Sequence, residues 1–174
     1  MPKAYQDKED TSIYGGKASK DSLRIQAIGD VDELHSFVGL AASRSENQEI
    51  REILKQVQNE LFVLGADLAT PADVKEKRQR TSEAEVKRLE ETIAKMEKEL
   101  PHLTHFILPG GTAEASLLHV CRSVARRAER SVIKLKKQEE VNEQTFRYLN
   151  RLSDFFFTLA RLANKLSGQE DETW

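Results

Sequence analysis

The sequence has little of what builds disulfide-linked, metal-stapled or membrane-embedded proteins. Its single cysteine, Cys121, cannot form a disulfide within the chain or a cysteine-rich metal site, and we expect it to be a small core residue. The four histidines have no zinc-like spacing with it, so we expect no catalytic role for them. No apolar run approaches the roughly 18–20 residues of a membrane span, and the polar, charged N-terminus does not resemble a signal peptide. We therefore expect a cytoplasmic protein that does not bind a membrane.

The chain also has little net charge. Lys and Arg total 27 and Asp and Glu total 29, which leaves a formal net charge of −2. This balance provides no global basic field that would attract nucleic acid or an anionic membrane. With 39% hydrophobic and 32% charged residues, the 174-residue chain suits one domain of helices, each with one buried stripe and a charged outer face.

Apolar residues recur at helical spacing in five segments. The first helix is predicted to begin near Asp30, because Asp30 and Glu33 have capping-box spacing. The others are predicted over residues 47–68, 82–100, 112–137 and 143–166, and Ser82 and Glu85 have the same capping-box spacing at the start of the third helix. No segment indicates a strand or an internal repeat. The prediction is a single all-α domain, 1–174, in which an irregular arm (1–29) precedes a five-helix bundle (30–167) and a frayed polar tail (168–174).

The segment 106–130 combines a rigid loop with an arginine-rich helix. Pro109-Gly110-Gly111 leads to Thr112, a plausible N-cap. Arg122, Arg126 and Glu129 then follow at i, i+4 and i+7, so they share one helix face, well round from the predicted core face. Arginine binds phosphate or carboxylate oxygens in a bidentate way. This face is a candidate polyphosphate site, a subunit contact or a solvated basic surface.

Two further segments carry polar residues with alternative interpretations. Helix 143–166 is apolar nearly all round but contains Asn150, Arg151 and Asp154, which indicate either a buried network that sets the helix register or part of a site. The N-terminal arm would be disordered alone, whereas its lysines, such as Lys20, could contact phosphate if the arm orders over a ligand.

Four segments resemble the PduO-type ATP:cob(I)alamin adenosyltransferases, in the order and spacing of that family. They are Val-Asp-Glu-Leu at 31–34, Phe-Ile-Leu-Pro-Gly-Gly at 106–111, Arg-Ser-Val-Ala-Arg-Arg-Ala-Glu-Arg at 122–130 and Arg-Tyr-Leu-Asn-Arg-Leu-Ser-Asp at 147–154. The resemblance implies a five-helix bundle that forms a homotrimer with active sites between subunits. It implies transfer of the 5′-deoxyadenosyl group of ATP to the cobalt of cob(I)alamin, release of triphosphate, and Mg²⁺ bound with the nucleotide. A cobalamin reductase and an adenosylcobalamin-dependent enzyme are the further partners it suggests.

The resemblance also assigns roles to individual residues. Phe106 would pack under the corrin and help displace the lower axial ligand, while Arg122 would pair with Asp32 across the subunit boundary. Arg126 would bind the phosphates, which makes Arg126, Arg122, Asp32 and Phe106 the implied catalytic set. Arg151 and Asp154 would form a structural polar network. The implied nucleotide-binding residues are Thr11, Gly16, Lys20, Arg126, Arg127, Glu129, Arg130 and Asn150.

The N-terminal arm departs from the family pattern. Gln6 and Glu9 occupy positions where the family has glycine, and Lys3 and Tyr5 replace two threonines. Glycine permits backbone shapes that other residues resist, and a glutamate adds negative charge beside phosphate. The alternative hypothesis is therefore a non-catalytic trimer that binds corrinoid or nucleotide as a carrier or sensor.

Overall fold

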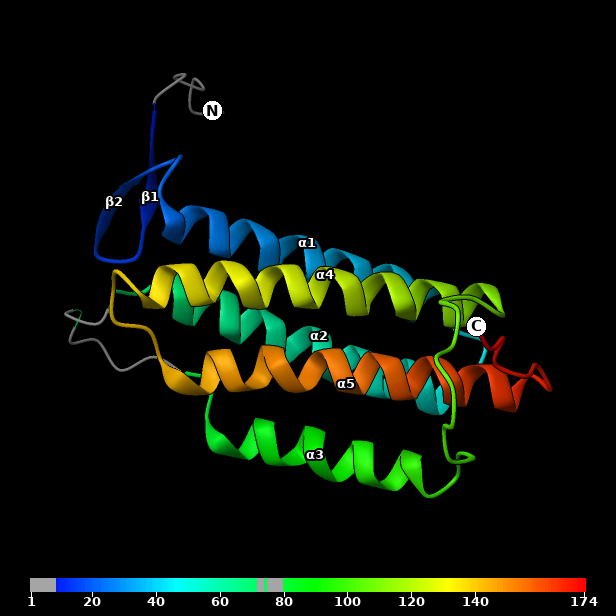
Figure 1. Ribbon diagram of the computed structural model, residues 1–174. Helices are drawn as coiled ribbons and strands as arrows, with labels where there is room; N and C mark the ends of the chain where they lie inside the picture. The colour runs from blue at the N-terminus through cyan, green and yellow to red at the C-terminus, as the bar shows by residue number, and fades with distance from the viewer. Residues whose placement is uncertain (1–8, 72–73, 75–79) are drawn as a thin grey trace.

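The computed structural model describes residues 9–71, 74 and 80–174. Figure 1 shows a bundle of long helices with a small hairpin at one end. Helices α1, α2, α4 and α5 form its four-helix core, and α3 packs along α5. The elements are β1 (Asp10–Ile13), β2 (Gly16–Ser19), α1 (Leu23–Arg44), α2 (Gln48–Leu68), α3 (Glu83–Glu97), α4 (Ala113–Lys136) and α5 (Glu143–Leu166).

Four of the five helices begin within one residue of their predicted starts, each after a capping residue. The side chain of Asn47 accepts hydrogen bonds from the amides of the first turn of α2, and Thr112 accepts one from Ala115 N at 3.1 Å. Ser82 and Glu85 form the predicted capping box at the start of α3. Such caps satisfy helix-end amides that would otherwise lack partners. Because a cap involves residues only two or three positions apart, sequence alone locates it.

The start of α1 was predicted wrongly. The helix begins at Leu23, seven residues before Asp30, and its N-cap is Ser22, whose hydroxyl accepts a hydrogen bond from Ile25 N at 3.3 Å. Asp30 lies inside the helix, where it accepts a hydrogen bond from the Ser131 hydroxyl of α4. Capping-box spacing alone therefore misplaced the helix start, because the Asp30 carboxylate is used in a tertiary contact.

The N-terminal arm contains strands that the sequence pattern did not indicate. β1 and β2 pair antiparallel, with Ile13 opposite Gly16, so two residues, Tyr14 and Gly15, form the turn. Gly15 has φ +82°, a conformation that residues with a Cβ atom rarely adopt. The departures at Lys3, Tyr5 and Gln6 lie outside the described residues.

The predicted apolar stripes form the core. Ile50, Leu54, Val57, Leu61, Leu64 and Leu68 of α2 are all buried, as are most of the predicted stripe residues of α1, α4 and α5. Among the described helices, none is long and apolar enough to cross a membrane.

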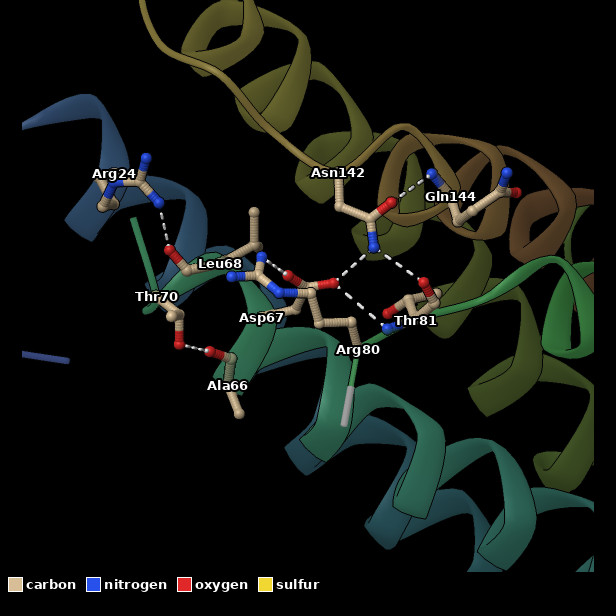
Figure 2. A network of polar contacts seen from close by, with 9 residues as sticks. All are labelled: Arg24, Ala66, Asp67, Leu68, Thr70, Arg80, Thr81, Asn142 and Gln144. Atoms are coloured by element: carbon tan, nitrogen blue, oxygen red, sulfur yellow. Dashed lines mark hydrogen bonds and ion pairs between the residues drawn. The ribbon is translucent and has the colours of Figure 1, made fainter. Parts of the chain in front are cut away.

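A buried carboxylate connects the α2 C-terminus to the starts of α3 and α5 (Figure 2). Asp67, which is 5% exposed, accepts hydrogen bonds from Arg80 Nη1 at 2.7 Å, Thr81 N at 3.2 Å and Asn142 Nδ2 at 2.6 Å. Asn142 Nδ2 also donates to Thr81 O at 2.7 Å, and Arg24 of α1 donates to Leu68 O. A carboxylate at a helix C-terminus faces the negative end of the helix dipole, so these donors stabilise its charge.

The C-terminal tail is ordered against the bundle, contrary to the prediction that it frays. Ile107 and Thr173 form an antiparallel β-bridge, and the tail also hydrogen-bonds to residues on both sides of Ile107. This pairing joins segments that are far apart in sequence, so no local sequence pattern predicts it.

Candidate functional site

The arginine face of α4 lines a cavity of about 470 Å³ between α3, α4 and α5. Arg122 and Arg126 contribute from α4, and Phe157 contributes from α5. Glu90 and Glu97 of α3 line the same space. The two arginines of the predicted stripe therefore lie neither on a simple solvated surface nor on a core face, but on one wall of a polar cavity.

Arg122 is half-buried, and part of its hydrogen-bonding capacity is unused. Its Nε atom is buried without a hydrogen-bond partner among the described residues, and its guanidinium lies 6.0 Å from the centre of the Phe157 ring. Burial and the neighbouring positive charge of Arg126 both lower the pKa of Arg122 from its ordinary value. A second arginine beside a desolvated one is unfavourable without an anion, so this pair is suited to bind one.

The other predicted nucleotide-binding residues of α4 have different surroundings. In the described part of the chain, no ion pair involves the exposed Arg126 or Arg130. Arg127, by contrast, forms ion pairs with Glu33 and Asp30 of α1. These contacts make Arg126 and Arg130 more available to a ligand than Arg127.

Glu129 and Asn150, both predicted to bind nucleotide, lie together. Asn150 Nδ2 donates to Glu129 Oε1 at 2.8 Å, and Asn150 Oδ1 accepts from Arg151 Nη2 at 3.1 Å. Both polar ends of the Asn150 amide are therefore used within the chain. A nucleotide contact to Asn150 would have to exchange with one of these hydrogen bonds.

Asp32 lies in a different cavity from Arg122. It is exposed on α1 and lines a space of about 460 Å³ formed by the hairpin, α1 and α2, together with Thr11, His35 and Phe62. Phe62 is 71% exposed, with its ring 6.3 Å from the His35 ring. The two cavities share no helix, so within one chain Asp32 does not line the cavity of Arg122 and Arg126.

The remaining predicted residues lie at the two ends of the bundle. Gly16 and Lys20 lie in and just after β2, where Lys20 N donates to Glu9 O at 2.8 Å. Phe106 is 82% exposed, and its backbone is hydrogen-bonded to the C-terminal tail, which lies at the opposite end of the bundle (Figure 1). The 24 residues of α4 between these ends span about 36 Å.

The polar network predicted on α5 forms, but it is not buried. Arg151 Nη1 pairs with Asp154 Oδ2 at 3.0 Å, and the two side chains are 40% and 52% exposed. An exposed pair of this kind contributes about 0–1 kcal/mol, so it does not set the helix register. Both residues instead line the α3–α4–α5 cavity.

His119, for which no catalytic role was expected, lies in the core next to Phe157. It is 4% exposed, and neither ring nitrogen has a hydrogen-bond partner among the described residues. Its ring packs edge-on against Phe157, with centroids 6.2 Å apart. Burial is the main cause that lowers the pKa of His119, Arg122 adds to it, and Asp171 acts in the opposite direction.

The lowered pKa of His119 predicts that the folded chain loses stability in acid. The unfolded state takes up a proton below the ordinary pKa of about 6.5, while the folded state resists it, so the free energy of unfolding should fall as pH drops through that range. His119→Phe, which keeps a ring against Phe157, should flatten this dependence in urea denaturation at pH 7.5 and pH 5.5. His102→Asn, at an exposed position, is the control. Equal slopes for His119→Phe and the unchanged chain would contradict the assignment.

Cys121 is fully buried, as expected for a core residue. Burial raises the pKa of its thiol to about 12. A thiol that stays protonated is a poor nucleophile, so the site does not depend on cysteine chemistry.

The fold and cavity together define a helical-bundle protein with an arginine-lined cavity. The sequence model of the cobalamin adenosyltransferase family matches residues 4–163, and the chain belongs to this family. It is 46% identical to the corrinoid adenosyltransferase of Bacillus subtilis over 95% of this chain and 86% of that one. It is 42% identical to the cobalamin adenosyltransferase of Cupriavidus metallidurans over 92% and 85% of the two chains.

Solved structures extend the likeness to three dimensions. A variant of the PduO-type ATP:corrinoid adenosyltransferase from Lactobacillus reuteri, complexed with cobalamin and ATP, superimposes with a TM-score of 0.91 at 40% identity. The match covers 97% of this chain and 95% of that one. Another variant of the same enzyme, complexed with ATP, gives a TM-score of 0.92 at 41% identity, over 97% and 96% of the two chains.

Proposed function

We propose that this protein transfers the 5′-deoxyadenosyl group of ATP to the cobalt of cob(I)alamin and releases triphosphate. The observation that carries the proposal is the pair of arginines, Arg122 and Arg126, which line a cavity in a chain of this family without an ion-pair partner among the described residues. The relatives are named as adenosyltransferases, which supports the hypothesis of a catalytic protein over that of a non-catalytic carrier.

The arginines of the cavity suit this reaction. The electron pair of Co(I) forms the new bond to ribose C5′ while the bond from C5′ to the triphosphate oxygen breaks. Cob(I)alamin is itself the nucleophile, so the protein needs no general base. It must hold cobalt and C5′ in line, and it must stabilise the negative charge of the departing triphosphate. Arg126, with Arg130 one turn further along α4, is placed to serve the second need.

A Mg²⁺ ion bound with ATP is consistent with this site. Among the described residues, no group of three or more His, Cys, Asp or Glu side chains is placed to hold a metal ion. Mg²⁺ commonly uses one or two carboxylates together with substrate phosphates and water. The ion would therefore enter as part of the nucleotide complex, beside the arginines.

We further propose that the site is completed between subunits of a homotrimer. Arg122 and Asp32 line cavities that share no helix, and Asp32 has no ion pair among the described residues. Joining the arginine cavity of one subunit to the Asp32 cavity of the next is a head-to-tail contact, and with a three-fold rotation between subunits such contacts close a ring of three. The exposed Phe62 beside Asp32 would be covered by the same contact.

On the corrin side, we assign Phe106 to the lower face of the ring. An aromatic side chain that is 82% exposed gains little from its own fold, but it provides a flat apolar surface for a ligand. There it would displace the lower axial ligand of cob(II)alamin and make the cobalt easier to reduce. A reducing cytoplasm that contains a cobalamin reductase is the setting this chemistry requires, and an adenosylcobalamin-dependent enzyme would take the product.

An anaerobic visible spectrum tests the activity. Chemically reduced cob(I)alamin mixed with the protein, ATP and Mg²⁺ should convert to a light-sensitive alkylcobalamin. Triphosphate should appear in equal amount, because each transfer breaks one bond from C5′ to triphosphate. No conversion at millimolar ATP, together with measurable corrinoid binding, would favour the non-catalytic alternative.

A further inference from the structure

The segment that carries Phe106 has a freely exposed side chain on a firmly held backbone. Trp174 N donates to Phe106 O at 2.9 Å, and Leu108 N donates to Glu172 O at 2.8 Å. Ile107 and Thr173 lie between these two hydrogen bonds as the paired residues of a β-bridge. The last three residues of the chain therefore hold the backbone on both sides of the bridge.

The tail is fixed in turn by a buried ion pair. Asp171 Oδ2 accepts from Arg161 Nε at 2.8 Å, and Asp171 Oδ1 accepts from Asn164 Nδ2 at 3.2 Å. Arg161 is 7% exposed and Asn164 is 2% exposed, and both belong to the last turns of α5. Arg161 Nη2 also donates to Pro101 O at 2.8 Å, so it holds the start of the same loop. Charge-assisted hydrogen bonds among buried groups are strong and geometrically demanding.

Asn164 also holds the loop that follows Phe106. Its Oδ1 accepts from Thr112 N at 3.0 Å, and its Nδ2 donates to Gly110 O at 3.2 Å. The approach is so close that a Cβ atom on Gly111 would lie 2.2 Å from Asn164 Oδ1, and Gly111 has φ +99°. One side chain on α5 thus contacts both the tail that pairs with residues 106–108 and the loop that leaves them.

We propose that Arg161, Asn164 and Asp171 are positioning residues that fix Phe106 against the lower face of the corrinoid. This inference rests on the proposed function. An aromatic ring can displace an axial ligand only if its own backbone stays in place when the ring meets that ligand. The network holds the backbone before, at and after Phe106. The residues act through Phe106 and need not touch either substrate.

The proposal predicts slower adenosylation only when the reaction starts from cob(II)alamin, the cobalt state that carries the lower ligand. Cob(II)alamin carries a lower axial ligand and must accept one electron before transfer, whereas cob(I)alamin does not bind that ligand. In Asp171→Asn, adenosylation that starts from cob(II)alamin with a reduced flavin as electron donor should slow by about 10-fold to 100-fold. Adenosylation that starts from chemically pre-reduced cob(I)alamin should keep its rate and its KM for ATP.

Electron paramagnetic resonance gives a second readout. With the unchanged protein and ATP, bound cob(II)alamin should lose the splitting that comes from the lower nitrogen ligand. In Asp171→Asn a larger share of the bound cob(II)alamin should keep it. Glu170→Gln, an exposed neighbour in the same tail, is the control and should match the unchanged protein in both readouts.

A deletion of residues 172–174 is a second test of the proposal, which still applies if Asp171→Asn does not fold. It removes the β-bridge but leaves the Arg161–Asp171 pair, and it should show the same selective defect. Equal slowing from both cobalt states, or an unchanged rate from cob(II)alamin in both variants, would overturn the proposal. Failure of the proposed function is distinguishable, because the unchanged protein would then not alkylate pre-reduced cob(I)alamin at all.

Discussion

Replacing Arg126 with alanine is expected to lower the rate of adenosyl transfer by about 10²-fold to 10³-fold. The guanidinium lines the α3–α4–α5 cavity beside the desolvated Arg122, where it is placed to stabilise negative charge as triphosphate departs. Because that charge develops in the transition state, most of the loss should appear in kcat rather than in KM. Anaerobic turnover of pre-reduced cob(I)alamin measures both constants.

Two further variants sharpen this prediction. Arg126→Lys keeps the positive charge but loses the bidentate fork, so its rate should lie between those of the alanine variant and the unchanged protein. Arg147→Ala is the matched control, because Arg147 is an exposed arginine on α5 whose described hydrogen bond goes to Gln144 at 3.3 Å. The assembly should keep its size in all three. Normal turnover by Arg126→Ala would falsify the phosphate role.

Mixing two inactive variants is expected to restore activity if the site lies between subunits. Asp32→Ala damages the α1–α2 face, and Arg126→Ala damages the α4–α5 face. In trimers reassembled from an equal mixture, about one quarter of the sites combine two undamaged faces, so activity should recover to about one quarter of that of the unchanged protein. Activity is measured after unfolding and refolding the variants together.

The control for this experiment is a mixture of Arg122→Ala and Arg126→Ala. Both residues line the same cavity, so every site keeps one damaged face and no recovery is expected. If the mixture of Asp32→Ala and Arg126→Ala also stays inactive although mixed trimers form, each site belongs to a single chain. A dimer or monomer in solution would likewise contradict the proposed assembly.

Much of the fold could be predicted because its signals are local. The start of α2 follows from Asn47 and that of α3 from the Ser82–Glu85 capping box, and both helices begin there. The buried stripe of α2 follows from apolar residues spaced three and four apart. Each of these features depends on residues within one or two helical turns, so the periodicity of the sequence contains them.

The candidate site was predictable in part. The spacing of Arg122, Arg126 and Glu129 placed them on one face, and the structure shows that the two arginines line a cavity. The arginines' individual roles came from resemblance, because spacing alone does not distinguish a phosphate ligand from a surface charge. Phe157, which lines the same cavity, was missed, since an aromatic residue on an apolar helix resembles a core residue until its neighbours are known.

The sequence by itself determined the five helices, four of their starting points and the arginine stripe, because helix periodicity and capping act over a few residues. Only the tertiary structure decided that α1 begins at Leu23, that residues 10–19 pair as a hairpin and that the tail docks beside Phe106. It also placed Asp32 and Arg122 in separate cavities and brought Asn164 to Gly111. These features depend on backbone pairing and side-chain contacts between segments far apart in the chain, and such contacts produce no periodic pattern in the sequence.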